Sequence, residues 1–192
     1  KNALLRSAQN EALAVEGVAA DADKAVKAAA FETHSSDIKQ AEMISMCLNT
    51  IGGGLGLVLF GWISNMLGRK GAFVFYHAGG FVMALLMFLV LIPNNASVPI
   101  LCLALPVFGF LTLGMHAGYA VYFPELFPTR LRGTGTGFCF NSGRFGTAAA
   151  MMLAASMSWK SEETALYLAP LYLLGIVVTL LAKETRGEEL PE

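Results

Sequence analysis

Long apolar stretches without any charge constrain this chain more than any other feature. No Asp, Glu, Lys or Arg occurs from Met43 to Gly68, or from Gly71 to Pro124. An apolar helix of about 20 residues spans a bilayer core. Charged residues make up only 14% of the chain, against roughly 25% in soluble domains. The runs also lack the alternation of barrel strands, so the sequence predicts an all-α, multi-pass membrane protein.

Charged and polar breaks divide the apolar sequence into five predicted spans. The spans lie at about 43–66, 71–92, 98–123, 133–158 and 164–182. Together with a short cytoplasmic tail they form a predicted transmembrane domain over residues 43–192. Residues 1–42 are predicted to be an extramembrane, external loop segment that is partly helical, with one helix expected over Asp21 to Phe31.

The basic residues of the loops gather on one side of the predicted membrane. The other side has only Lys160 in its short loops. Because Lys and Arg are in excess in cytoplasmic loops, we expect a protein of the plasma (cell inner) membrane with a cytoplasmic C-terminus. The residues on the basic side are Arg69, Lys70, Arg130, Arg132, Lys183 and Arg186.

Several classes of function have no support in the sequence. The net charge of −1 and the lack of a long basic run argue against a nucleic-acid partner. The cysteines lack metal-ligand spacing, so no metal site and no cofactor are predicted. The glycines of 52–54 and of 133–137 fit no nucleotide-binding motif, and close helix packing explains them better. No nucleophile–base or carboxylate pair occurs in the spans, so we do not expect an enzyme.

Two loops and the end of the chain carry short motifs. Gly61–Lys70 reads G-W-I-S-N-M-L-G-R-K, Pro124–Gly133 reads P-E-L-F-P-T-R-L-R-G, and Glu184–Leu190 reads E-T-R-G-E-E-L. In order and spacing they resemble motifs of the major facilitator superfamily of transporters, in its sugar-porter, organic-ion and aromatic-acid branches. Asn65 stands where the first family motif has Asp, and Lys183 where the tail motif has Pro.

The resemblance covers roughly residues 43–192. It implies that the five spans are helices 8 to 12, a partial second half of the family's bundle, and that the chain, which begins at Lys1, is a fragment whose N-terminal half lies elsewhere. Helix 10 would line the central cavity, with 8 and 11 beside it and 9 and 12 outside. The implied function is secondary transport of a small organic solute by alternating access. A sugar transporter, or a membrane sensor or interaction protein on the same fold, remains the alternative.

Arg144 lies deep inside a predicted span. It follows Gly133 by eleven residues, or about 16 Å of helix, which places it near mid-membrane. A charge there costs at least about 2.5–3.5 kcal/mol and requires a partner, yet no Asp or Glu occurs in the five spans. The partner is a backbone carbonyl, a group outside this chain or an anionic substrate. We therefore predict an organic anion, with an arginine pinned to a neighbouring helix as the alternative.

Other polar side chains complete the predicted substrate site. Asn141 shares a helical face with Arg144, and His116 and Tyr119 share a face of the 98–123 span. Asn49 lies on a polar stripe of the first span. Because histidine titrates near neutral pH, His116 is a candidate proton carrier, and a hydrogen-bonded packing role is the alternative.

The charged loops are also predicted to act. The resemblance implies a cytoplasmic charge network that closes the inner side of the cavity. Solvated charge that only sets the topology is the alternative. The predicted gate residues are Arg69, Lys70, Glu125, Arg130 and Arg132.

Overall fold

The computed structural model describes residues 2–15, 17, 32–94, 96–157, 159 and 161–191, and every regular element in them is helical. This confirms the predicted all-α class. The helix predicted over Asp21 to Phe31 lies outside the described residues. The elements are α1 (Asn2–Val15), α3 (Ser35–Leu85), the π-helix η1 (Leu86–Leu91), α4 (Val98–Leu113), α5 (Met115–Leu126), α6 (Arg132–Ser156), α7 (Ser161–Leu168) and α8 (Pro170–Leu181).

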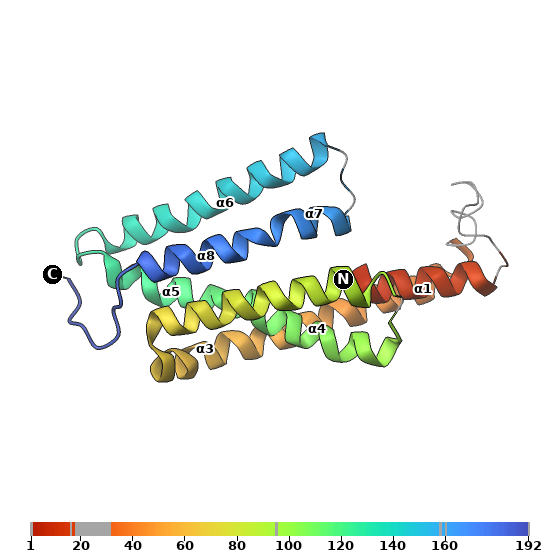
Figure 1. Ribbon diagram of the computed structural model, residues 1–192, viewed down its shortest axis with the longest axis horizontal. Coiled ribbons are helices and arrows are strands. Elements are labelled where there is room, and N and C mark those ends of the chain that lie inside the picture. Colours follow the sequence, from red (N-terminus) through yellow and green to blue (C-terminus); the bar gives the residue numbers. More distant parts are fainter. Residues whose placement is uncertain are drawn as a thin grey trace.

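Helix α3 consists of two antiparallel halves joined at Gly68. This residue has φ 80° and ψ 170°, a conformation that glycine adopts because it lacks Cβ. The halves pack on each other: the Phe60 and Phe73 ring centroids are 5.6 Å apart, and the Tyr76 hydroxyl donates a 2.9 Å hydrogen bond to the Gly56 carbonyl. In Figure 1, α3 therefore runs to the left of the view, reverses and returns.

Three features meet at this left end of Figure 1: the Gly68 reversal, the turn between α5 and α6, and the C-terminal tail. We call it the charged end of the bundle. Two buried apolar clusters hold the helices together along their length. One joins the end of α3 and η1 to α4, and the other joins both halves of α3 to α5. The first cluster includes Met83, Met87 and Leu105, and the second includes Phe60, Phe73, Tyr76 and Tyr122.

The first half of α3 crosses α4 at backbone contact. A Cβ on Gly52 would lie 1.9 Å from the Pro106 carbonyl oxygen, and one on Gly109 would lie 2.0 Å from the Asn49 carbonyl oxygen. Close packing therefore explains Gly52, as predicted. Within the described part of the chain nothing packs against Gly133 or Gly137 of α6, because a Cβ on either would meet none of its atoms within 4 Å.

Three helical stretches of the described chain are long and apolar enough to cross a membrane: Ser35–Leu91, Val98–Leu126 and Glu163–Leu181. The first contains the reversal at Gly68, so it holds two of the predicted spans. Helix α6 is not among the three, because its polar and small residues, Arg144 among them, lower its mean hydropathy. The count of five spans stays a prediction.

The α3–α4 crossing predicts a strong difference between two neighbouring glycines. Gly52→Ala should lower the free energy of unfolding by about 1–3 kcal/mol, because a carbonyl on a packed helix cannot yield to the new methyl group. Gly54→Ala is the matched control: nothing lies within 4 Å of its Cβ position, and alanine gains up to about 1 kcal/mol of helix propensity. Thermal unfolding of the purified protein in detergent measures both. Equal melting temperatures would contradict the crossing.

Candidate functional site

A groove of about 500 Å³ lies between α5 and α6. This volume falls in the usual range of small-molecule sites, about 300–1,000 Å³. The groove brings together three of the five predicted substrate residues, His116 and Tyr119 from α5 and Arg144 from α6. The complete lining is His116, Tyr119, Phe123, Cys139, Phe140, Gly143, Arg144 and Thr147.

Arg144 lines the groove with an exposed side chain. Its guanidinium makes no hydrogen bond and no ion pair with the part of the chain that the structure describes. No Asp or Glu lines the groove. The groove therefore carries one positive charge whose counter-charge, if it has one, comes from outside the described residues.

The polar groups of α5 in the groove bond to residues three or four positions earlier in the chain. The His116 ring donates from Nδ1 to the Leu113 carbonyl at 3.1 Å, which leaves Nε2 of the neutral ring as an acceptor. The Tyr119 hydroxyl lies 3.3 Å from the Met115 sulfur, to which it donates. The imidazole thus presents a nitrogen at the groove that no described residue engages.

The structure does not bring the two predicted asparagines to the groove. Asn141 is exposed, and its side-chain amide donates to the Gly137 carbonyl at 2.8 Å. Asn49 is half-buried at the α3–α4 crossing beside Gly109, where its Oδ1 has no partner among the described residues. Substrate contact by Asn49 or Asn141 stays a prediction that this geometry does not support.

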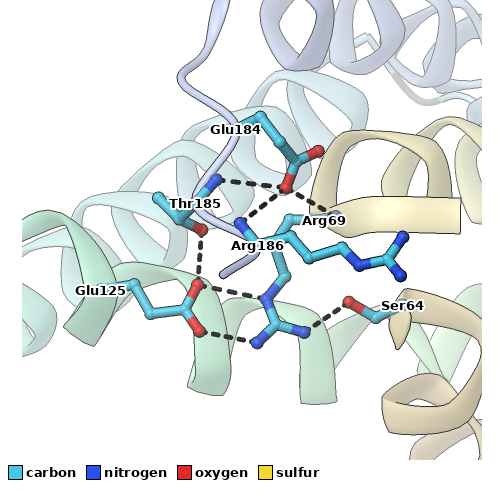
Figure 2. A network of polar contacts seen from close by, with 6 residues as sticks. All are labelled: Ser64, Arg69, Glu125, Glu184, Thr185 and Arg186. Atoms are coloured by element: carbon cyan, nitrogen blue, oxygen red, sulfur yellow. Dashed lines mark hydrogen bonds and ion pairs between the residues drawn. The ribbon is translucent and has the colours of Figure 1, made fainter. Parts of the chain in front are cut away.

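Side chains from three segments form a polar network at the charged end (Figure 2). The Arg69 guanidinium meets the Glu125 carboxylate in two hydrogen bonds, of 2.8 and 3.2 Å. The two side chains are only 17% and 16% exposed. Arg69 also donates to the buried Ser64 hydroxyl at 2.7 Å, and Thr185 donates to Glu125 at 2.5 Å. Breaking such a bidentate, largely buried pair would leave one ion unpaired at high cost.

Glu184 anchors the tail to the reversal of α3. Its carboxylate accepts backbone N–H bonds from Arg69, Lys70, Thr185 and Arg186, at 2.9 to 3.1 Å. Partial burial raises the pKa of Glu184, but the four backbone donors outweigh it and hold the pKa below its ordinary value of 4.5. A Cβ on Gly68 would lie 2.8 Å from this carboxylate, so the glycine also makes room for it.

The five predicted gate residues occupy different places in this network. Arg69 and Glu125 form its central pair, while Lys70 contributes through its backbone N–H. Arg132 joins neither acid and donates instead to the Pro124 and Pro191 carbonyls, at 3.1 and 3.3 Å. Arg130 is exposed and makes no hydrogen bond or ion pair with the described residues.

The gate prediction omitted four members of the network: Ser64, Glu184, Thr185 and Arg186. A signal for the last three was present, because the E-T-R-G motif of the tail follows the last span and so ends on the same side as both charged loops. Ser64 carried no such signal, since a serine five residues before an arginine in an apolar helix is ordinary.

Comparison with known proteins decides the family. The model of the Major Facilitator Superfamily matches residues 25–192, which is most of the chain. The chain belongs to the major facilitator superfamily. No solved structure matches it in the corresponding search, so its assignment to the superfamily rests on sequence.

Curated relatives of this superfamily chain are transporters. The sialic acid transporter NanX of Escherichia coli (strain K12) is 34% identical over 54% of the chain and 25% of NanX. The cis,cis-muconate transport protein of Acinetobacter baylyi is 34% identical over 50% of the chain and 22% of that protein. The inner membrane metabolite transport protein YhjE of Escherichia coli (strain K12) is 30% identical over 76% of the chain and 33% of YhjE. The chain spans about a quarter to a third of their length.

The depressed pKa of Glu184 predicts a pH-dependent anchor. Its contribution to stability should be fully present above the unfolded pKa near 4.5 and be lost as the pH falls through the lower folded value. At pH 7, Glu184→Gln should therefore destabilise the protein by about 1–2 kcal/mol, and the difference should shrink below pH 4.5.

Melting temperatures of the two proteins across this pH range test the anchor. Glu189→Gln is the matched control, because Glu189 is exposed in the same tail and should behave like the unmodified protein. A Glu184→Gln difference that persists unchanged at low pH would show that the carboxylate charge is not what holds the tail.

Proposed function

We propose that this chain is part of a secondary transporter that carries a small organic anion across the cell inner membrane. Its superfamily and its curated relatives consist of transporters rather than enzymes. The groove between α5 and α6 is the proposed binding site, and the rest of the transporter supplies its other walls. The charged end, where the basic loops gather, is the proposed cytoplasmic side.

The observation that carries the proposal is the unpaired guanidinium of Arg144. A cation in a membrane-embedded groove needs a counter-charge, and no described residue supplies one. A carboxylate fits because the planar guanidinium can donate two parallel hydrogen bonds to it. A neutral sugar would leave the charge unbalanced. Two relatives are named for acids, sialic acid and cis,cis-muconate, which supports the same substrate class.

We further propose proton coupling through His116 and alternating access controlled at the charged end. His116 lines the same groove as Arg144, so protonation of its free nitrogen would add a second positive charge beside the bound anion. The Arg69–Glu125 pair joins the reversal of α3 to the end of α5. Breaking and remaking this pair would shift the balance between two states of the transporter.

The substrate proposal predicts that carboxylate uptake depends on the Arg144 charge. In the complete reading frame, reconstituted into vesicles, Arg144→Ala should lower the affinity for a carboxylate about 10- to 100-fold, the value of a charge-assisted hydrogen-bonded pair. Arg144→Lys keeps the positive charge but loses the planar guanidinium that donates two parallel hydrogen bonds. This variant should therefore retain partial uptake.

Lys39→Ala is the control, because Lys39 is an exposed cation near the start of α3 and does not line the groove. Carboxylate uptake by this variant should be unchanged. Equal amounts of folded protein in the vesicles must be verified for every variant. Undiminished carboxylate affinity in Arg144→Ala would refute the anion proposal and leave Arg144 a structural role.

The gate proposal predicts a change in rate rather than in recognition. Glu125→Gln removes the charge that pairs with Arg69 and changes no residue that lines the groove, so turnover should change several-fold while substrate affinity stays within about twofold. Initial uptake rates over a range of substrate concentrations separate the two quantities. An altered substrate preference with normal turnover would assign Glu125 to recognition instead.

A further inference from the structure

Four aromatic side chains form one continuous surface of the groove, which we call the ring wall: His116, Tyr119, Phe123 and Phe140. Tyr119 and Phe123 are stacked, with centroids 5.3 Å apart and planes 17° from parallel. Phe140 of α6 stands edge-on to Phe123 at 5.4 Å, and His116 stands edge-on to Tyr119 at 6.3 Å. The wall therefore continues from one helix of the groove to the other.

The polar hydrogens beside the ring wall are already engaged. The hydroxyl of Thr147 donates to the Gly143 carbonyl at 3.0 Å. The hydroxyl of Tyr119 donates to Met115, and the ring N–H of His116 donates to Leu113. Of the groups that line the groove, the Arg144 guanidinium is the one strong donor that the described residues leave unengaged; the Cys139 thiol is a free but weak donor. A solute covered with hydroxyl groups would leave several of them without partners, which is costly away from water.

The groove is therefore divided into a cationic part and an aromatic part. We infer that its ligand is a carboxylate with a flat, unsaturated or aromatic body, and that Phe123 and Phe140 select it over polyhydroxylated acids. This inference rests on the proposed transport of an organic anion and specifies the substrate class. Arg144 holds the carboxylate, while the rings contact the body through stacked and edge-to-face packing, the geometries that aromatic groups prefer.

Three carboxylates of one charge separate the possibilities. Benzoate is flat and aromatic, cyclohexanecarboxylate has the same number of carbons in a saturated ring, and gluconate is polyhydroxylated. The complete transporter is reconstituted into vesicles, and the affinity for each acid is measured as its inhibition of carboxylate uptake. We expect benzoate to bind more tightly than cyclohexanecarboxylate by about two- to tenfold, and gluconate to bind most weakly.

The matched variants are Phe140→Leu and Phe138→Leu, on the same helix two residues apart. Phe138 is 72% exposed and does not line the groove, so its replacement should leave the three affinities unchanged. Phe140→Leu keeps an apolar side chain of similar size and removes the ring. It should reduce or abolish the preference for benzoate over cyclohexanecarboxylate.

The outcomes distinguish this inference from the proposal on which it rests. Uptake that depends on Arg144 but favours gluconate would overturn the ring-wall inference and leave the anion proposal standing. A Phe140→Leu variant with equally reduced affinity for all three acids would have the same consequence, because the Phe140 ring would then only pack the helices. Failure of every carboxylate to bind would overturn both.

Discussion

The carboxylate of Glu184 is the contact on which the geometry of the charged end depends. It accepts backbone N–H bonds from the reversal of α3 and from the tail that follows α8, so two segments more than a hundred residues apart share one acceptor. Gly68 makes this contact possible, since its positive φ turns the chain and its missing side chain leaves room for the carboxylate. With Arg69 fixed in this way, its guanidinium reaches Glu125 of α5.

Carboxylates lie in the network at the charged end and not in the groove that Arg144 lines. Glu125 and Glu184 both lie at the charged end, where a carboxylate can be hydrogen-bonded and partly solvated at modest cost. The five predicted spans hold no acid that could pair with Arg144. A cation retained in such a place without a partner in its own helices is typical of a binding site rather than of packing.

The sequence predicted the helical class and the two charged loops, because charge-free apolar runs and loop motifs are local features. Helical periodicity placed Arg144, His116 and Tyr119 on polar faces of their helices, and the family resemblance implied that these faces share a cavity. The sequence did not predict the exclusion of Asn49, which depends on the backbone contact between Gly109 and α3. The ring wall was also missed, because Phe123 and Phe140 lie in different helices and only their tertiary packing joins them.

The groove and the charged end share α5. This short helix begins after Gly114 and carries His116 near its start and Glu125 near its end, nine residues or about 13 Å apart. At the charged end the other wall is tied to it: Arg132, the first residue of α6, donates to the Pro124 carbonyl of α5. The ion pair with Arg69 and the hydrogen bond from Arg132 therefore hold the end of the helix that carries most of the ring wall. The same short helix supplies the aromatic surface of the groove and the acid of the network.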